Sequence, residues 1–245
     1  MIELEHLGKR YGDFTAVHDL SFAVGAGEVM GLVGPNGAGK TTTLRCLSGI
    51  IPATAGHARI GGVDIAVDPV GAKRQLAFIP DEPRLFDHLT VEQHLNFVAR
   101  LYGIADWQAR AHPILEELEM ADKRKLLPAE LSRGMKQKLA IACGLLHAPR
   151  AVILDEPLTG LDPYGIRRMK DAIRRLASEG VAIILSSHLL DLVEEVCTHL
   201  LILKDGNKVV DGTVAQVRAL YGADGDASLE DVFFRATSEA GRARA

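Results

Sequence analysis

The chain has 245 residues and a formal net charge of −4, with 28 basic and 32 acidic side chains mixed along it. This length fits one large domain, or a domain with a subdomain, and is sufficient to bury a substantial core. The nearly balanced charge and the aromatic content of 5% argue against a general nucleic-acid-binding surface, so nucleic acid is not an expected partner.

Two further features bear on where the protein works. Its three cysteines, Cys46, Cys143 and Cys197, are far apart and form no C-x-x-C pair, which is typical of buried thiols in a reducing cytosol. The first residues, MIELEHLGKRYG, lack the charged and apolar regions of a secretion signal. No apolar run approaches the roughly 18 residues that a bilayer span requires. We therefore expect a cytoplasmic protein, for which any membrane part must come from another chain.

Short apolar runs and longer helical patterns alternate along the chain and predict an α/β fold. Near the start, residues 3–11 and 14–24 alternate in polarity, which predicts an antiparallel β layer. Helical patterns separate four later apolar runs, as in layered α/β proteins with a mostly parallel sheet. Those four runs are typical of strands buried on both faces and cover residues 28–34, 75–81, 151–157 and 181–188.

The segment from about residue 83 to 148 differs, because its pattern is mostly helical. Thr90 and Gln93 have the spacing of a capping box, which predicts a helix start. Residues 107–128 are typical of further helix and turn, and another helix is predicted to begin at Ser132. The apolar faces of the first and last helices are Val91, Leu95, Val98 and Tyr102, and Leu131, Met135, Leu139, Ala142 and Leu146. We expect an α-helical subdomain inserted in the α/β unit.

The C-terminal region is simpler. Residues 200–213 predict a β-hairpin with its turn at Asp205-Gly206 or at Gly206-Asn207. One domain is therefore expected over residues 1–220. The remaining stretch, 221–245, is predicted as a loop, a short amphipathic helix and a disordered tail, over residues 221–228, 229–237 and 238–245.

The stretch GPNGAGKT, residues 34–41, matches the phosphate-binding pattern G-x-x-x-x-G-K-[ST], and it follows a predicted strand and opens a helix. Its glycines let consecutive N–H groups point at phosphates, and the helix start adds partial positive charge. With ATP and Mg²⁺, we expect Lys40 to reach the terminal phosphates, Thr41 to offer its hydroxyl to the metal and Thr42 to touch an inner phosphate. The predicted nucleotide contacts are Gly34, Pro35, Asn36, Gly37, Ala38, Gly39, Lys40, Thr41 and Thr42.

The run AVILDEP, residues 151–157, supplies candidates for metal binding and water activation. Asp155 can hold Mg²⁺ through water, and Glu156 can orient and polarise the attacking water. His188 ends the next buried run, where a γ-phosphate contact is predicted. Alone, the acidic pair is typical of a solvated turn and the histidine of a structural role. Beside a phosphate loop, the predicted catalytic residues are Lys40, Glu156 and His188.

A second helix start with the features of an anion site lies at LSRGMKQKL, residues 131–139. Ser132 can cap the helix, Gly134 allows close backbone approach, and Lys136 and Lys138 add positive charge. Taken alone, these nine residues are equally typical of a capped helix with surface lysines. One small domain has no obvious use for two phosphate sites of its own.

The phosphate loop, LSRGMKQKL, ILDEP, LTGLDP and the strand-end histidine resemble, in this order and over nearly the whole chain, the motifs of ABC ATPases. The resemblance implies a P-loop NTPase core and two subunits packed head to tail, a homodimer in the simplest case. It implies that Ser132 and Gly134 bind the γ-phosphate held by the partner's phosphate loop. It also assigns Tyr11 to stacking on adenine, Asp162 to contact with the opposite subunit and His188 to the role of a switch.

Two departures from the family pattern matter. Arg133, Gly134 and Met135 stand where the signature usually has Gly-Gly-Gln. Met135 cannot make a glutamine's polar contact, whereas Arg133 could offer charge to a phosphate or to a partner carboxylate. Asp81 stands where the family's coupling loop usually carries glutamine. It either reaches Mg²⁺ through water, as a third metal residue beside Thr41 and Asp155, or takes no part, and both interpretations stay open.

The signature together with the closing SLEDVFFRAT resembles the ATP-binding subunits of bacterial ABC-2-type exporters. This resemblance implies a separate transmembrane permease, to which the chain would bind at the inner face of the cell membrane. ATP binding would close the dimer, and the helical subdomain with the Asp81 loop would carry the motion to the permease. Two alternatives remain: an ABC ATPase of DNA repair, translation or cluster assembly, and a regulatory nucleotide binder without turnover. The intact Lys40, Asp155, Glu156 and His188 disfavour the second.

Overall fold

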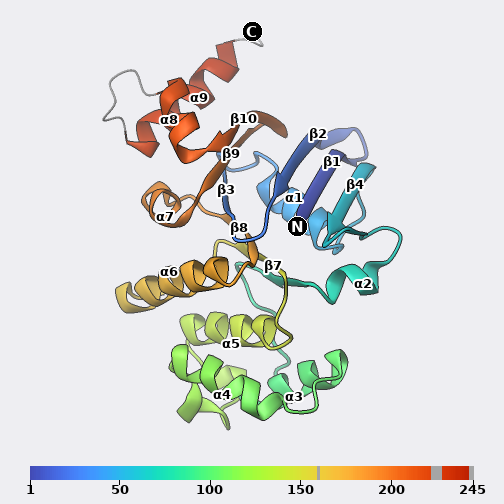
Figure 1. Ribbon diagram of the computed structural model, residues 1–245, viewed down its shortest axis with the longest axis vertical. Coiled ribbons are helices and arrows are strands. Elements are labelled where there is room, and N and C mark those ends of the chain that lie inside the picture. Colours follow the sequence, from blue (N-terminus) through green and yellow to red (C-terminus); the bar gives the residue numbers. More distant parts are fainter. Residues whose placement is uncertain (159–160, 222–227, 243–245) are drawn as a thin grey trace.

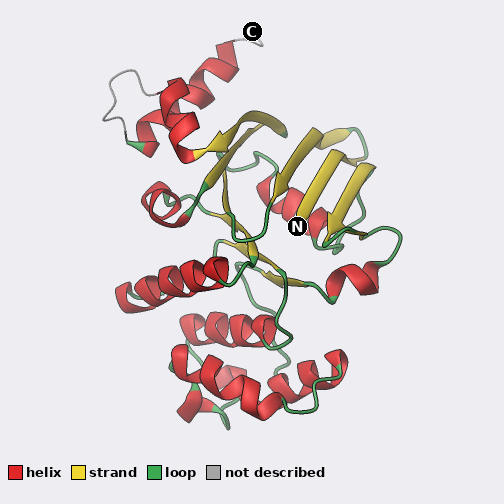
Figure 2. Ribbon diagram, in the orientation of Figure 1, coloured by secondary structure: helices red, strands yellow, loops and turns green. Residues whose placement is uncertain are grey.

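The computed structural model describes residues 1–158, 161–221 and 228–242, whose strands form two sheets (Figures 1 and 2). The smaller sheet contains β1 (Ile2–Tyr11), β2 (Phe14–Val24), β4 (Ala55–Ile60) and β5 (Val63–Asp64). It is antiparallel throughout, with the strand order β2–β1–β4–β5. The antiparallel layer expected at the start of the chain is confirmed, and β4 and β5 extend it.

The larger sheet has the order β10–β9–β3–β8–β7–β6, and every neighbouring pair is parallel except β10 with β9. All residues of β3, β7 and β8 are buried, which explains why these segments read as unbroken apolar runs. The strands are β3 (Val29–Val33), β6 (Leu76–Ile79), β7 (Ala151–Asp155), β8 (Ala182–Ser186), β9 (His199–Lys204) and β10 (Asn207–Thr213).

The turn of the β9–β10 hairpin is now decided. Lys204 pairs with Asn207, so the two turn residues are Asp205 and Gly206. Both have positive φ, 47° and 71°, as a two-residue type I′ turn requires. The first of the two turns that the sequence allowed is therefore the one formed.

Alternate residues of the central strands face two separate parts of the core. Val152 and Ile183 pack in the cluster that includes the helices between β6 and β7. Ile153 and Ile184 point the other way, into a cluster shared with the smaller sheet and α1 (Lys40–Leu47). The larger sheet is thus covered on both faces, which fixes the position of its carboxyl edge, where β3, β7 and β8 end.

The helices between β6 and β7 lie together at one end of the molecule (Figure 1). They are α3 (Val91–Tyr102), α4 (Trp107–Glu117), η1 (Ala121–Lys123), η2 (Pro128–Glu130) and α5 (Arg133–Leu145). The predicted capping box is confirmed, since the Thr90 hydroxyl accepts from the Gln93 amide at 3.3 Å and the Gln93 side chain accepts from the Thr90 amide at 2.8 Å. The mostly helical pattern of this segment is therefore confirmed, while its treatment as a subdomain stays a prediction.

The remaining helices are α2 (Pro69–Lys73), α6 (Pro163–Ser178), α7 (Leu190–Val196), α8 (Val214–Tyr221) and α9 (Leu229–Arg242). α9 continues beyond the short helix expected over 229–237 and includes residues 238–242, which the sequence assigned to a disordered tail. Buried Leu229, Val232 and Ala236 dock the helix, and once docked it propagates readily through its next turn. Most of the expected loop (222–227) and the last residues (243–245) lie outside the described residues. Within the described part of the chain, no helix has both the length and the apolarity of a membrane span.

Candidate active site

The loop between β3 and α1 has the curled backbone that its sequence predicts. Gly37 and Gly39 have φ values of 80° and 99°, a conformation that side chains disfavour. A Cβ on Gly39 would also lie 2.7 Å from the carbonyl oxygen of Ala16 on β2. The amide of Gly206, in the β9–β10 turn, donates to the Ala38 carbonyl at 3.1 Å. The loop is therefore held by β2 on one side and by the hairpin turn on the other.

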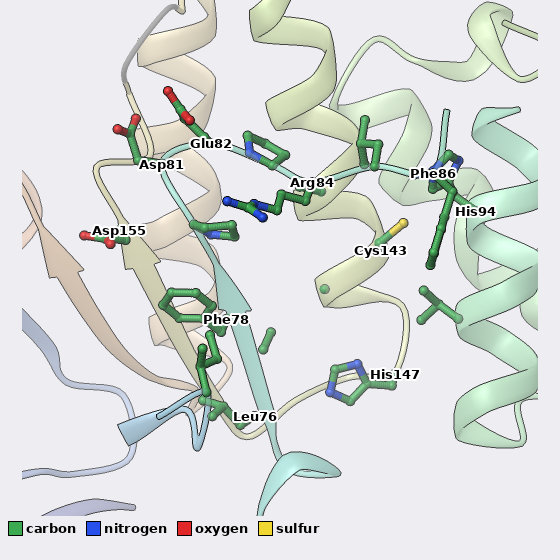
Figure 3. Close-up of a pocket in the computed structure, with 18 of the residues that line it drawn as sticks. Leu76, Phe78, Asp81, Glu82, Arg84, Phe86, His94, Cys143, His147 and Asp155 are labelled. Carbon is green, nitrogen blue, oxygen red and sulfur yellow. The ribbon is translucent and has the colours of Figure 1, made fainter. Parts of the chain in front are cut away.

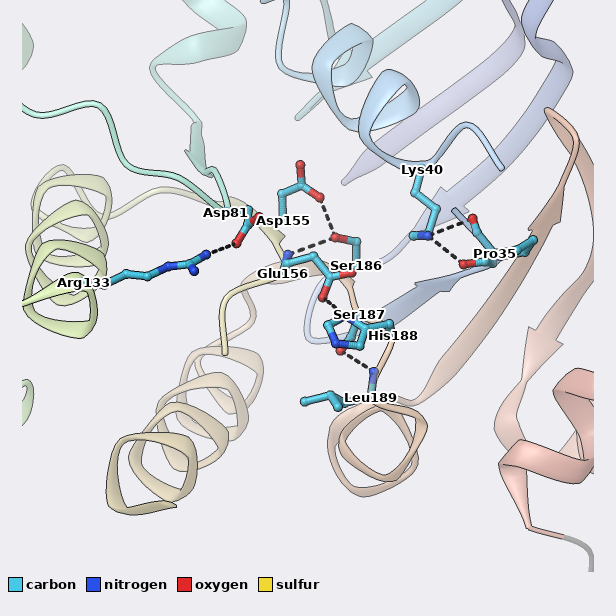
Figure 4. A network of polar contacts seen from close by, with 11 residues as sticks. Pro35, Lys40, Asp81, Arg133, Asp155, Glu156, Ser186, Ser187, His188 and Leu189 are labelled. Carbon is cyan, nitrogen blue, oxygen red and sulfur yellow. Dashed lines mark hydrogen bonds and ion pairs between the residues drawn. The ribbon is translucent and has the colours of Figure 1, made fainter. Parts of the chain in front are cut away.

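The start of α1 presents amide groups that no side chain caps. The first bond of the helix runs from the Thr43 amide to the Gly39 carbonyl at 2.9 Å, so the amides of residues 40–42 precede the helical ladder. Such a helix start favours a bound anion. Lys40 Nζ donates to the carbonyls of Gly34 at 2.6 Å and Pro35 at 3.2 Å (Figure 4).

The ammonium of Lys40 lies close enough to two acidic side chains to interact with their charges. Burial lowers the pKa of Lys40, while the nearby carboxylates of Glu156 and Asp155 act in the opposite direction. Lys40 and the acidic pair are 115 residues apart in sequence, from 155 − 40, yet they meet at the carboxyl edge of the sheet. The predicted grouping of phosphate loop and acidic pair is therefore present.

Asp155 is the last residue of β7, and its carboxylate is almost fully buried, with 5% of the residue exposed. Its Oδ1 accepts a hydrogen bond from the hydroxyl of Ser186 at 2.7 Å, and the two residues pair across β7 and β8. No sequence pattern predicted a role for Ser186. A small polar residue in the apolar run VAIILSSH, two positions before His188, was the signal that could have indicated it.

Glu156 has the left-handed backbone conformation, with φ of 51°, which costs a non-glycine residue roughly 1–3 kcal/mol. Its amide donates to both the carbonyl of Ser186 at 3.2 Å and the hydroxyl at 3.1 Å, which hold this conformation. Its Oε2 lies 2.8 Å from Nδ1 of His188 (Figure 4). Ser186 therefore supports both acidic residues, and the left-handed turn directs Glu156 toward His188.

The second predicted anion site lies apart from the first. Ser132 caps α5, and its Oγ accepts from the Met135 amide at 3.2 Å, as the sequence predicted. Figure 4 shows Arg133, the first residue of α5, across the site from Lys40. The partner of Arg133 is Asp81 of the same chain, with 3.3 Å between Nη2 and Oδ1.

Three predicted site residues have local roles in the described chain. Asp162 caps α6 through a 2.7 Å bond from the Gly165 amide to its Oδ1. Tyr11 closes the β1–β2 hairpin and is 48% exposed, with Lys9 Nζ 4.9 Å from its ring centre. Asp81 lines a cavity together with other site residues, as described next. The adenine, partner and metal roles of these three residues stay predictions.

One cavity of about 910 Å³ joins the phosphate loop to the helices between β6 and β7 (Figure 3). Its lining includes Thr41, Asp155, Glu156 and Asp81, together with Phe97 and Leu101 of α3, Cys143 of α5 and His147 just beyond α5. Figure 3 shows Asp81 and Asp155 on one side of the cavity and Cys143 and His147 on the other. Sequence patterns did not indicate this cavity, because its walls come from segments far apart in the chain.

Residues 17–159 of the chain, more than half of its length, match the family model described as ABC transporter. The chain belongs to the ABC transporter family. It is an ATP-binding subunit of this family, an ATPase whose turnover drives transport, as the motifs indicated.

Individual relatives match most or nearly all of the length of this ABC ATPase. The ABC-type transporter ATP-binding protein EcsA of Bacillus subtilis (strain 168) is 33% identical over 241 residues, covering 98% of the chain and 97% of EcsA. The Nod factor export ATP-binding protein I of Paraburkholderia xenovorans (strain LB400) is 38% identical over 213 residues, which are 86% of the chain and 70% of that protein. A solved structure of an ATP-binding subunit of an ABC transporter has a TM-score of 0.92 and 34% identity, covering 97% of the chain and 99% of the solved one.

Proposed function

We propose that two copies of this chain close head to tail over ATP and power export through a separate membrane permease, at the inner face of the cell membrane. The observation that carries the proposal is the contact between Glu156 and His188 beside the phosphate loop, while the capped start of α5 lies apart from them. Export is supported by relatives such as the Nod factor export ATP-binding protein I. The whole-length similarity to transporter ATP-binding subunits favours this function over a non-transport ABC ATPase.

The residues of the site fit ATP with Mg²⁺. The glycine loop has no room for a Cβ at Gly39, its helix start offers uncapped amides, and Lys40 lies within the same loop. Thr41 and Asp155 line the same end of the cavity and supply the hydroxyl and carboxylate oxygens that Mg²⁺ prefers. When bound, Mg²⁺ would neutralise charge on the phosphate oxygens. Tyr11, on the hairpin whose second strand borders the loop, is the proposed adenine platform.

In the hydrolytic step, water attacks the γ-phosphorus of ATP, and the bond to the bridging oxygen of ADP breaks. Glu156 is the group proposed to accept a hydrogen bond from this water and to orient it, a contribution typically worth roughly 10²–10⁴-fold in rate. His188, in contact with Glu156, fixes the direction of that carboxylate and can meet the γ-phosphate. Lys40 stabilises the negative charge of the terminal phosphates.

The site is proposed to be complete only when two chains meet. The amide-rich start of α5, with Ser132 and Gly134, is a second place suited to a phosphate, yet Arg133 beside it lies across the site from Lys40. A two-fold axis would bring each α5 start over the ATP held by the other copy, and would give two identical composite sites. Asp162, at the start of α6, is proposed to contact the other copy beside this junction.

The other end of the cavity is the proposed permease contact. Phe86 and Phe97 stack edge to face at 5.2 Å and are exposed, and Ile50 and Leu101, which line the same cavity, are exposed as well. Such a group of apolar side chains at the mouth of a cavity is typical of a protein-binding surface. Because the same cavity reaches Asp155 and Glu156, nucleotide binding beside these residues would alter the surroundings of a permease segment bound in the cavity.

Glu156→Gln provides the direct test. This variant keeps the shape of the side chain but removes its charge, so it should bind ATP and Mg²⁺ normally, lose nearly all phosphate release and accumulate as an ATP-dependent dimer. Phosphate release and size-exclusion chromatography measure the two effects, and Lys40→Ala, which should fail to bind ATP, is the control that stays monomeric. Normal turnover of Glu156→Gln, or a monomer at saturating ATP and Mg²⁺, contradicts the proposal. The proposed permease contact is tested by purifying the chain from detergent-solubilised membranes and asking whether an integral membrane protein co-purifies with it.

A further inference from the structure

Two contacts join the loop that follows β6 to the first turns of α5. Gln137 is buried, with 2% of the residue exposed, and its Nε2 donates to the carbonyl of Pro80 at 3.2 Å. One turn closer to the start of α5, Arg133 Nη2 donates to Oδ1 of Asp81 at 3.3 Å (Figure 4). Neighbouring residues of the loop are thus held by side chains one helical turn apart on α5.

Asp81 lies between the phosphate pocket, where the chain's own ATP is proposed to bind, and the start of α5, which is proposed to bind the partner's ATP. It lines the same cavity as Thr41 and Asp155, on the side where Asp155 lies (Figure 3). Its carboxylate is bound, however, to Arg133, which follows the cap residue Ser132. A single ion pair therefore connects the edge of the phosphate pocket to the helix start proposed to bind the partner's ATP.

The pair is better suited to coupling than to stability. The side chains of Asp81 and Arg133 are 42% and 54% exposed, and an ion pair so exposed contributes little to folding. A positive side chain in the first turn of a helix is also unfavourable toward the helix dipole, and the Asp81 carboxylate offsets this effect. The contact can therefore form and break at little cost to the fold, while it orders Arg133 beside Ser132.

We propose that the Asp81–Arg133 ion pair couples the loop after β6 to the start of α5, so that changes in the phosphate pocket bias the position of the helix start that faces the partner. This inference rests on the proposed head-to-tail function. It assigns Asp81 and Arg133 as positioning residues and gives Asp81 a role different from direct metal binding. The buried hydrogen bond from Gln137 to Pro80 holds the loop against α5 permanently, whereas the exposed ion pair can form and break.

A double-mutant cycle with Asp81→Asn, Arg133→Gln and the double variant tests the inference. Each single variant should lower the ATP turnover number roughly 1.5- to fivefold, the range expected for losing one exposed ion pair, and the double variant should be no slower than either single one. Arg110→Gln is the matched control, because it removes an ion pair to Asp106 of the same 3.3 Å length on α4. It should leave turnover unchanged.

The second readout is independent of activity and of dimer formation. Hydrogen exchange of the amides in residues 81–86 should accelerate severalfold in Arg133→Gln and to the same extent in Asp81→Asn, and the difference from the parent chain should shrink at high salt. The inference is overturned if the double variant loses turnover by the product of the two single losses. It is also overturned if hydrogen exchange of the amides in residues 81–86 is unchanged in Arg133→Gln. A higher Mg²⁺ concentration required for half-maximal turnover in Asp81→Asn, but not in Arg133→Gln, overturns the inference as well, because it indicates a metal role. Failure of the dimer proposal would appear in Glu156→Gln and would leave the exchange result standing.

Discussion

His188 Nδ1 lies 2.8 Å from Oε2 of Glu156, although the two residues are 32 positions apart in the chain. The contact is possible because β7 and β8 are parallel neighbours that end at the same edge of the sheet. Ser186 reinforces it, since its carbonyl and hydroxyl both accept from the Glu156 amide. The water-orienting carboxylate proposed here is therefore fixed at both its backbone and its side chain.

Replacing His188 with alanine should slow turnover much more than it weakens nucleotide binding. Without the imidazole, the Glu156 carboxylate loses the contact that directs it, and we expect the turnover number to fall roughly 10²-fold, at the low end of acid–base contributions. Phosphate release measures turnover, and a fluorescent ATP analogue measures affinity. His57→Ala is the control, because it removes a histidine–carboxylate contact of the same 2.8 Å length, to Asp64, on the smaller sheet. Equal effects of the two variants would remove His188 from the mechanism.

Ser186→Ala should affect both stability and turnover. The variant removes the only hydroxyl bonded to the buried Asp155 carboxylate among the described contacts and one of the two acceptors of the Glu156 amide. Leaving such a buried group short of a partner costs about 1–3 kcal/mol of unfolding free energy, which urea titration measures. Turnover should fall as well, because Glu156 loses support. Ser178→Ala, at the exposed end of α6, should change the unfolding free energy by less than about 0.5 kcal/mol.

Local patterns predicted most of the fold and much of the site, for physical reasons. The buried strands, the Thr90 capping box and the glycine loop each depend on neighbouring residues, so their sequence signals are complete within a short window. The hairpin turn was narrowed to two positions by the residues that tolerate positive φ, and the register then decided between them.

Contacts between segments that are far apart in the chain could not be predicted from local sequence patterns. Ser186 carries no motif, and its support of Asp155 arises only from the pairing of two strands. The ion pair between Asp81 and Arg133 spans 52 positions and joins the two places where the chain departs from its family's usual residues. Both unusual residues can be recognised in the sequence, but only the three-dimensional structure shows that they contact each other.

Gly39→Ala should abolish tight ATP binding. The new Cβ would lie 2.7 Å from the Ala16 carbonyl, in a residue with φ of 99°, so the loop must shift away from β2. We expect ATP affinity to fall roughly five- to 150-fold, since roughly 1–3 kcal/mol of strain is relieved only by deforming the phosphate cradle. Gly62→Ala is the matched control, because its φ is 81° but no atom lies within 4 Å of the new Cβ. It should lose some stability and keep its ATP affinity.

Mixing two inactive variants distinguishes sites shared between copies from sites complete in one copy. Ser132→Ala damages the helix start offered to the partner, whereas Lys40→Ala damages the chain's own phosphate loop. In a mixed dimer, the loop of the first variant meets the helix start of the second, and one intact composite site results. Each mixed dimer has one of its two sites intact. Turnover of the mixture should thus rise clearly above that of either variant alone and reach at most about half of the parent value, if the sites act independently.

The matched control for this mixture pairs Lys40→Ala with Glu156→Gln. Lys40 and Glu156 belong to the same half of the proposed site, since both lie at the carboxyl edge of one sheet and Glu156 influences the Lys40 ammonium. Every mixed dimer then has one damaged loop and one damaged carboxylate at different sites, and neither site is intact. Steady-state phosphate release across a series of mixing ratios should therefore rise to a maximum for the first pair and stay flat for the second. Flat curves for both pairs would mean that each copy completes its own site.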